Sequence, residues 1–159
     1  MNQVRVCKIF TFDAAHQLEG HKGKCANVHG HTYKLEVIVS GVPITADNPA
    51  EEGFVMDFGD IKEVVKEKIV DVLDHSFLAM GNEPGFEALR HTGSKISQLG
   101  FRTTAENLCL FICHTLRSSG LPMYSVRVWE TPTSYAEVLA AEIPASGPVY
   151  RTVGVCDIG

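Results

Sequence analysis

The chain has 159 residues, of which 45% are hydrophobic and 21% are charged, and its formal net charge is −5 at pH 7. This length suits one domain whose core needs no disulfide bonds. The acidic balance argues against a general nucleic-acid-binding protein, and no apolar run approaches the roughly 18 residues of a membrane span. We therefore expect a globular protein with neither a nucleic acid nor a membrane as partner.

The N-terminal residues and the cysteines together predict a cytoplasmic location. Residues 1–10 lack the basic segment, apolar stretch and small-residue cleavage site of a signal peptide. The cysteines are odd in number and form no C-x-x-C pair, which favours reduced thiols over a disulfide framework. The five are Cys7, Cys25, Cys109, Cys113 and Cys156.

The first half of the chain predicts two strands followed by a helix. Residues 4–16 alternate between apolar and other side chains, with His16 at the end of the apolar face. Residues 31–40 alternate in the same way. From Asp57, which we expect to cap a helix, apolar residues recur at helical spacing as far as Leu73.

The second half predicts one more helix and two more strands. The helix follows a capping box from Thr103 to Glu106, and the strands span residues 123–130 and 135–143. The order β-β-α-α-β-β predicts an α+β fold, with a four-stranded antiparallel sheet and two helices on one face. Residues 79–102 form a long glycine-rich connection, which we expect to be a lid or an insertion. The two open edges of so small a sheet favour a homo-oligomer.

Three histidines predict a metal site at one end of the first two strands. His29 and His31 are two residues apart, so an extended backbone directs both imidazoles to one face. Gly30 between them tolerates unusual backbone angles. His16 ends the apolar face of the first strand, and pairing of the strands would bring three neutral imidazoles together, as in a catalytic zinc site. For any one of these histidines alone, an ordinary hydrogen-bonded role is the commoner one.

Cys25 is the cysteine whose setting is most typical of a working thiol. It follows Lys24 and lies three residues after Lys22, and nearby cations favour the reactive thiolate. The four residues from Cys25 to His29 allow the sulfur to lie near the metal without binding it. The alternative is a buried apolar side chain, the usual environment of a free cysteine, but the polar, glycine-rich stretch "GHKGKCANVHGH" disfavours it.

Two further features have catalytic character. Asp74 and His75 end the first helix, where an aspartate can orient a histidine and tune its proton affinity. A helix C-terminus that favours a cationic imidazole would also explain His75. Glu130 ends an apolar row on the strand 123–130, where a carboxylate needs a partner. A ligand with a guanidine-like edge would provide one through two parallel hydrogen bonds, and an internal arginine is the alternative.

Six segments occur in order along the chain: "FTFDAAH" (10–16), "KCANVHGH" (24–31), "VMDF" (55–58), "LDHSFL" (73–78), "TTAEN" (103–107) and "VWET" (128–131). Together they resemble the 6-pyruvoyl-tetrahydropterin synthase / 6-carboxytetrahydropterin synthase family. The resemblance implies the tunnelling fold (T-fold), in which subunits assemble into a barrel trimer and usually a hexamer.

The same resemblance implies a role for each candidate residue. It places zinc at His16, His29 and His31. It makes Cys25 the general base, with Asp74 and His75 as its proton-transfer partners. Glu130 would anchor the 2-amino-pyrimidinone edge of a pterin, and Thr104 and Glu106 would line the pterin pocket, although helix capping alone would explain Glu106. We add Lys24, with Lys22, as a candidate contact for a substrate triphosphate; simple solvation is the alternative for both.

The spacing Cys-x-x-x-His-Gly-His resembles the bacterial 6-carboxytetrahydropterin synthases of queuosine (7-deazapurine) biosynthesis. The implied reaction converts 7,8-dihydroneopterin triphosphate to 6-carboxy-5,6,7,8-tetrahydropterin, acetaldehyde and triphosphate. The chain departs from the bacterial pattern in having Thr103 in place of proline and Ala79 in place of asparagine. We expect one domain at 1–143, with an insertion at 79–102, and a C-terminal extension at 144–159.

Three other functions remain open from the sequence. A 6-pyruvoyl-tetrahydropterin synthase or a related pterin side-chain lyase would use the same residues, although the cysteine spacing argues against it. A zinc-dependent hydrolase would use the three histidines with Glu130 as base and would need no thiol. A binding module without catalysis would not need the combination of thiol, Asp-His pair and metal site.

Overall fold

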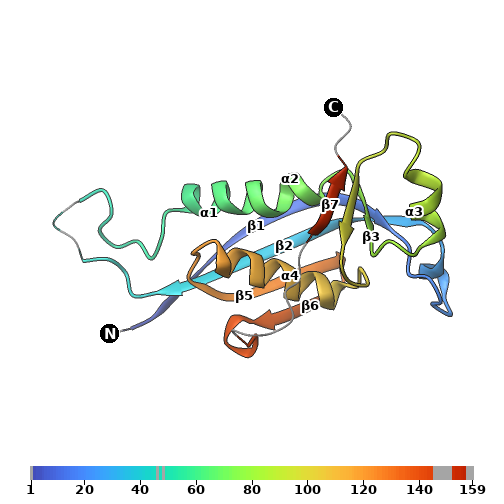
Figure 1. Cartoon of the computed structure of the whole chain (residues 1–159). Helices are drawn as coiled ribbons and strands as arrows, with labels where there is room; N and C mark the ends of the chain where they lie inside the picture. The colour runs from blue at the N-terminus through green and yellow to red at the C-terminus, as the bar shows by residue number, and fades with distance from the viewer. Residues whose placement is uncertain (1, 46, 48, 145–151, 157–159) are drawn as a thin grey trace.

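The computed structural model describes residues 2–45, 47 and 49–144, together with the backbone of residues 152–156. Within these residues, seven strands form one sheet in the order β6-β5-β2-β1-β3-β4-β7. Figure 1 shows two long central strands, β1 and β2, with the helices α1, α2 and α4 beside them and α3 at one end. The fold is therefore α+β, as the sequence predicts.

The four strands predicted from alternation lie next to one another as an antiparallel unit. In β1, the side chains of Phe12, Ala14 and His16 are buried, whereas the residues between them are exposed or half-buried. In β2, every second residue from Tyr33 is buried, namely Tyr33, Leu35, Val37 and Val39. The four strands are β1 (Val4–His16), β2 (His29–Gly41), β5 (Met123–Thr131) and β6 (Ser134–Leu139), and residues 140–142 form a 3-10 turn instead of continuing the last strand.

The prediction of a four-stranded, wholly antiparallel sheet is wrong, because three more strands extend it beyond β1. β3 (Ser76–Ala79) runs parallel to β1, β4 (Ile96–Leu99) runs parallel to β3, and β7 (Thr152–Cys156) is antiparallel to β4. All four residues of β3 are buried, so the strand shows no alternation by which to recognise it. The region 79–102 therefore contains α3 (Pro84–Leu89) and β4 instead of an irregular connection.

The two predicted helices pack on one face of the sheet. The first comprises α1 (Phe58–Val65), a π-helical turn over residues 66–70 and α2 (Asp71–Leu73), and the Asp57 side chain caps it by accepting from the Gly59 N–H. The second is α4 (Ala105–Ser118). One apolar core joins both helices to the sheet, and its fully buried members include Leu35, Val37, Ile61, Ile69, Leu108 and Ile112.

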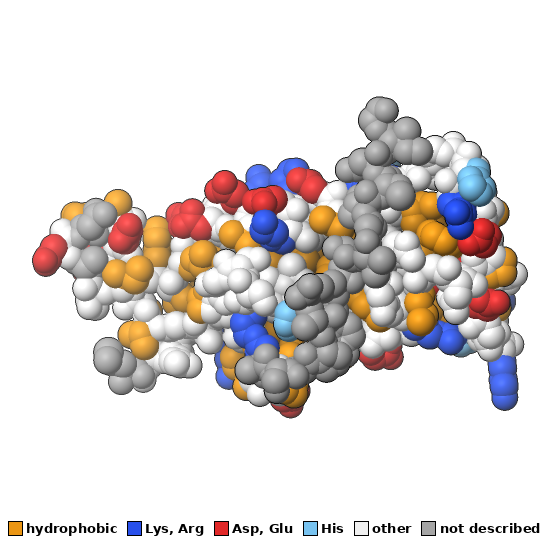
Figure 2. Space-filling model, in the orientation of Figure 1, with side chains coloured by type: hydrophobic (Ala, Val, Ile, Leu, Met, Phe, Trp, Pro, Cys, Tyr) orange, Lys and Arg blue, Asp and Glu red, His pale blue; other side chains and the backbone are white. Residues whose placement is uncertain are grey.

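The segment between β2 and α1 extends away from the rest of the molecule and carries exposed apolar side chains. Figure 2 shows hydrophobic side chains at that end of the surface. The exposed ones in the segment are Val42, Ile44 and Phe54, and the exposed Phe58 follows as the first residue of α1. Among the described residues, none of the helices combines the length and apolar character needed to cross a membrane. The homo-oligomer stays a prediction, and of the extension at 144–159 only Pro144 and the β7 backbone lie within the described residues.

Candidate active site

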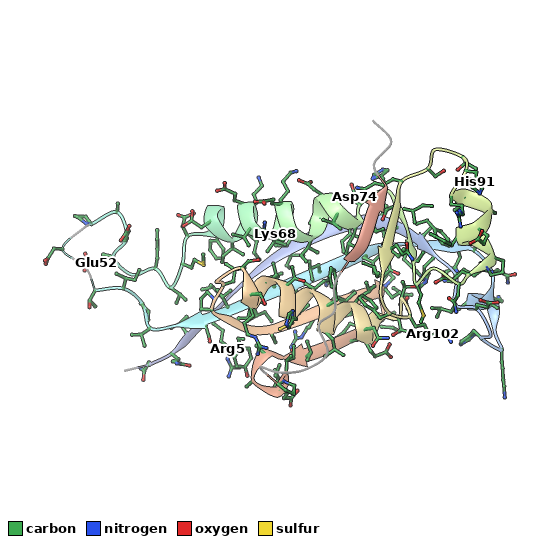
Figure 3. The ribbon with its side chains drawn as sticks, in the orientation of Figure 1. Arg5, Glu52, Lys68, Asp74, His91 and Arg102 are labelled. Carbon is green, nitrogen blue, oxygen red and sulfur yellow. The ribbon has the colours of Figure 1, made fainter. Side chains whose placement is uncertain are left out.

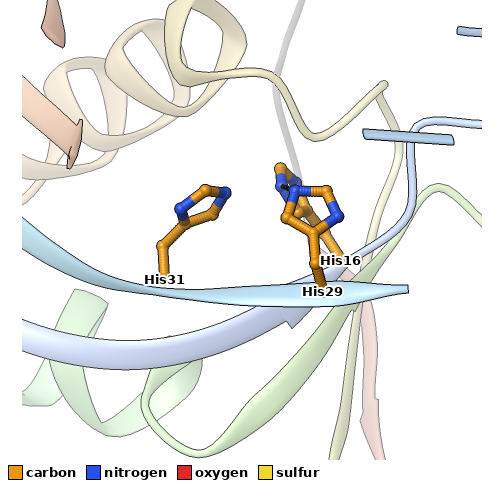
Figure 4. A group of neighbouring side chains, drawn as sticks. All are labelled: His16, His29 and His31. Atoms are coloured by element: carbon orange, nitrogen blue, oxygen red, sulfur yellow. Dashed lines mark hydrogen bonds between the residues drawn. The ribbon is translucent and has the colours of Figure 1, made fainter. Parts of the chain in front are cut away.

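The pairing of β1 with β2 brings the three predicted metal ligands together. His16 lies opposite His29 in the antiparallel register, and Ala14 lies opposite His31. His29 and His31 therefore share one face of the sheet with His16, as Figure 4 shows. Their candidate ligand atoms all lie within 4.8 Å of one another. Gly30 turns the opposite way, where a Cβ would lie 3.3 Å from the Ala14 carbonyl oxygen.

Hydrogen bonds to the backbone fix how two of these rings are protonated. The Nδ1 of His16 lies 2.9 Å from the Thr103 carbonyl oxygen, and the Nδ1 of His29 lies 2.7 Å from the Asn27 carbonyl oxygen. A carbonyl can only accept, so each Nδ1 carries the proton and each neutral ring presents a lone pair at Nε2. The two Nε2 atoms are nonetheless only 3.1 Å apart. Two nitrogen lone pairs repel each other at that distance unless a cation lies between them, so the arrangement indicates a cation site.

The spacing of the ring nitrogens fits a tetrahedral metal ion. Two nitrogens bound to one tetrahedral zinc at 2.0–2.1 Å would lie about 3.3 Å apart. The Nε2 of His31 is buried and has no hydrogen-bond partner among the described residues, so a third ligand atom is available. The three histidines can therefore hold a metal.

Burial keeps the imidazoles of His16 and His31 in the neutral form that binds metals. His16 is fully buried, and this lowers its pKa from 6.5 to about 4, although the hydrogen bond to Thr103 opposes the change. Burial also lowers the pKa of His31, while the Glu130 carboxylate opposes it. Both rings stay neutral near pH 7, and neither must lose a proton before a metal binds.

The Glu130 carboxylate lies against the histidines. Its Oε1 is 3.6 Å from the Nε2 of His16 and 3.7 Å from the Nε2 of His31, too far for good hydrogen bonds. A carboxylate oxygen beside imidazole lone pairs again indicates space for a cation. Glu130 is half-buried and also lines the adjoining cavity, so a ligand in that cavity can reach it.

Four of the predicted catalytic and substrate-binding residues line that one cavity of about 360 Å³ beside the histidines. Its wall comes from the turn Lys24–Ala26, from the start of α4 and from the ends of β5 and β6. We name it the Cys25 cavity. The four residues are Cys25, Thr104, Glu106 and Glu130.

The other described cysteines differ from Cys25 in their surroundings. Burial in the core raises the pKa of Cys109 to about 12 and that of Cys113 to about 11. Both thiols stay protonated near neutral pH and are inert. Cys7 lies on the exposed sheet face opposite the core. Neighbouring side chains cover it in part, and this partial burial raises its pKa as well. Cys25 is half-buried and lines a cavity, which is the setting that a working thiol requires.

Asp74 and His75 form a pair, and His75 lines a different cavity from Cys25. The Nδ1 of His75 lies 2.9 Å from an Asp74 carboxylate oxygen. Partial burial favours the neutral carboxyl of Asp74, but hydrogen bonds from the Asp13 N–H and from His75 outweigh it, so the pKa of Asp74 is lowered. The carboxylate is therefore ionised near neutral pH. His75 lines a cavity of about 680 Å³ together with Lys95, Thr32 and other residues; we name it the His75 cavity.

The start of α4 differs from the prediction by one residue. Thr104, not Thr103, is the N-cap, and its side chain accepts from the Asn107 N–H. Thr103 is fully buried and uses its carbonyl oxygen to orient His16. Sequence reasoning missed this role because a backbone acceptor leaves no signature in side-chain identity.

Several charged residues complete the surroundings of the site. Lys24 is exposed and does not line the Cys25 cavity, so its contact with a triphosphate stays a prediction. Arg102, which the sequence analysis did not single out, does line it, next to the cap of α4. Figure 3 shows Arg102 ahead of α4, Asp74 at the end of α2, and His91 on the segment after α3. His91 is exposed, as expected for a loop histidine.

Comparison with known proteins identifies the family to which the chain belongs. The model of the family described as 6-pyruvoyl tetrahydropterin synthase matches residues 5–141. The chain belongs to this family. A relative from Haemophilus influenzae named 6-carboxy-5,6,7,8-tetrahydropterin synthase is 44% identical over 138 residues, which cover 84% of this chain and 96% of the relative. A relative of the same name from Rickettsia bellii is 34% identical over 142 residues, covering 85% of this chain and 99% of the relative.

Solved structures share the fold of this family member. The structure of Caenorhabditis elegans 6-pyruvoyl tetrahydropterin synthase superposes with a TM-score of 0.63 at 25% identity, covering 87% of this chain and 96% of that one. The Plasmodium vivax 6-pyruvoyl tetrahydropterin synthase gives a TM-score of 0.64 at 19% identity, covering 87% of this chain and 98% of that one. The α+β arrangement is therefore that of the T-fold proteins in this family.

Proposed function

We propose that this protein is a zinc-dependent 6-carboxy-5,6,7,8-tetrahydropterin synthase. It would convert 7,8-dihydroneopterin triphosphate to 6-carboxytetrahydropterin, acetaldehyde and triphosphate, as a step toward queuosine. The observation that carries the proposal is the 44% identity to a protein of that name over 96% of its length. The three-histidine cluster beside a cavity lined by a thiol and a carboxylate supports it. Its reduced cysteines suit the cytoplasm, where we place it.

In this proposal each residue has one task. His16, His29 and His31 hold the zinc, and zinc when bound stabilises negative charge on substrate oxygens as a Lewis acid. Glu130 accepts two hydrogen bonds from the 2-amino-pyrimidinone edge of the pterin and so fixes its orientation. The Cys25 thiolate removes a proton from the substrate side chain. Thr104 and Glu106 line the same cavity and shape it around the substrate.

The Asp74–His75 pair would act from a second copy of the chain. Within one chain, His75 lines the His75 cavity, while Cys25 and Glu130 line the other one. A homo-oligomer, trimer or hexamer, that apposes the His75 cavity of one subunit to the Cys25 cavity of the next would complete the site. The exposed sheet edges and the apolar segment between β2 and α1 are surfaces that such an assembly would bury.

The test is a product assay by mass spectrometry on zinc-loaded protein with 7,8-dihydroneopterin triphosphate. We expect 6-carboxytetrahydropterin and acetaldehyde from the wild type and from Cys7→Ala, which removes an exposed thiol outside both cavities. Cys25→Ala should lose turnover by about a hundredfold or more.

Three other results would each contradict a part of the proposal. A pyruvoyl product would make the protein a 6-pyruvoyl-tetrahydropterin synthase. Retained turnover in Cys25→Ala would favour a zinc-dependent hydrolase that uses Glu130 as its base. Binding of zinc and pterin without turnover would favour a binding module.

A further inference from the structure

The C-terminus of α2 is capped by side chains from outside the helix. The last carbonyls of a helix have no partner within it, and each needs a donor when it is buried. Here three side chains donate to four consecutive carbonyls. Lys95 Nζ donates to Asp71 O at 2.7 Å and to Asp74 O at 2.9 Å, Ser97 Oγ to Val72 O at 2.6 Å, and Ser76 Oγ to Leu73 O at 2.7 Å.

Two of these donors are held by the sheet and by burial. Ser97 is fully buried and Ser76 is 4% exposed, and their hydroxyl oxygens lie 3.0 Å apart. Ser76 begins β3, Ser97 lies in β4, and the two strands pair in parallel. Lys95 directly precedes β4 and is half-buried. The donors are therefore attached to a rigid element, and the helix end is fixed relative to the sheet.

The turn that this cap secures contains the Asp74–His75 pair. His75 has a φ of +56°, a left-handed conformation that is uncommon for a residue with a side chain. Such a conformation persists only when the surroundings enforce it. On one side, the His75 N–H donates to Asp13 O at 2.7 Å, and the Asp13 N–H donates to the Asp74 carboxylate at 2.8 Å. On the other side stands the Lys95 ammonium at Asp74 O.

We propose that Lys95 and Ser97 are positioning residues that hold the Asp74–His75 pair in its working geometry. The proposal rests on the proposed catalytic role of that pair. Lys95 lines the same cavity as His75, but its ammonium is directed to the two carbonyls at the helix end. Its effect on the reaction therefore passes through the turn. Without it, Asp74 O loses a charged donor, and the turn that holds the left-handed His75 backbone loses its contact on that side.

Steady-state kinetics of the zinc-loaded protein give the first readout. Lys95→Met should lower kcat about tenfold or more with less than about a threefold change in KM, because a misplaced proton-transfer group slows chemistry more than it weakens binding. Lys95→Arg, which keeps the charge and the donors, should recover most of the loss. Lys66→Met is the matched control, because Lys66 pairs with Asp71 near the same helix end without touching Asp74; it should stay within about twofold of wild type.

A double-mutant cycle separates positioning from a loss of overall stability. In a His75→Ala background, Lys95→Met should change kcat by less than about twofold, because the group that it positions is absent. A full tenfold loss in that background would overturn the proposal. So would a raised KM at unchanged kcat, since Lys95 would then bind the substrate directly. If Lys95→Met does not fold, Ser97→Ala enters the same cycle in its place.

Nuclear magnetic resonance of the histidine rings keeps this inference separate from the proposed function. The His75 ring signals in a ¹H–¹⁵N spectrum are assigned by their loss in His75→Ala. Lys95→Met and Ser97→Ala should shift them, whereas Lys66→Met should not. If His75→Ala keeps full activity while Lys95→Met shifts the signals, the catalytic role of the pair fails and the positioning stands. If His75→Ala loses activity and Lys95→Met shifts nothing, the positioning is refuted.

Discussion

The metal-free protein should lose stability in mild acid because of one buried histidine. In the folded state, burial lowers the pKa of His16 from 6.5 to about 4, whereas the unfolded chain titrates near 6.5. Between those two values the unfolded state binds a proton that the folded state does not bind. The free energy of unfolding therefore falls as the pH falls through this window, and the contribution of His16 is fully present above about pH 6.5.

The size of the effect follows from the separation of the two pKa values. They lie about 2.5 pH units apart, and each unit corresponds to about 1.4 kcal/mol, so His16 alone costs about 3 kcal/mol by about pH 4. This is a large part of the 5–15 kcal/mol that is typical of a folded domain. His31, whose pKa burial also lowers, adds to the loss in the same direction.

Urea denaturation of chelator-treated protein at several values between about pH 7 and about pH 4 measures this loss. Aspartates and glutamates titrate in the lower part of that range, so the informative quantity is the difference between wild type and His16→Gln. We expect the wild type to lose about 3 kcal/mol more than the variant. His91→Gln, which removes an exposed histidine, should follow the wild type. Parallel curves for wild type and His16→Gln would refute the reasoning.

Two further substitutions test the proposed pterin contact of Glu130 and the buried hydroxyl of Tyr33. Glu130→Gln should raise KM for the pterin by about 10- to 100-fold, because a charged acceptor of two hydrogen bonds is lost, while zinc content measured by atomic absorption stays at the wild-type value. The control is Glu137→Gln, which alters an outer ion pair with Arg127. An unchanged KM in Glu130→Gln would show that Glu130 does not bind the pterin. The hydroxyl of Tyr33, a fully buried residue, has no hydrogen-bond partner among the described residues. Tyr33→Phe should therefore leave the free energy of unfolding unchanged or raise it by up to about 1 kcal/mol, and a clear loss in urea denaturation would show that the hydroxyl is paired.

The parts of the fold that the sequence predicted are those with a strong local signal. Alternation in residues 4–16 placed His16 on the buried face, and the His-x-His spacing placed two more rings on the same face. The three-histidine cluster follows from these two facts and from the antiparallel pairing of β1 with β2. Asp57 likewise predicted the start of the helix that it caps.

The parts that were missed depend on contacts between distant segments. β3 is buried on both faces, so its four residues show no period, and β4 pairs with β3 and β7, both of which lie outside its own local sequence. The capping box at Thr103 was misplaced by one residue because two threonines stand side by side, and only the contact with His16 decides between them. Lys95 gave no signal, since an ammonium bound to carbonyls is indistinguishable in sequence from a solvated one.

The two halves of the proposed site differ in what holds them. The candidate metal ligands lie on two directly paired strands, and the Thr103 and Asn27 carbonyls of the same chain orient two of them, so a single folded chain already contains that half. The Asp74–His75 pair stands on a strained turn whose geometry requires Lys95 and β4. His75 also lines another cavity, and in the proposed assembly the pair would meet the Cys25 of a neighbouring copy. Metal binding should accordingly survive perturbations of β4 or of the assembly that abolish turnover, because only the second half of the site depends on them.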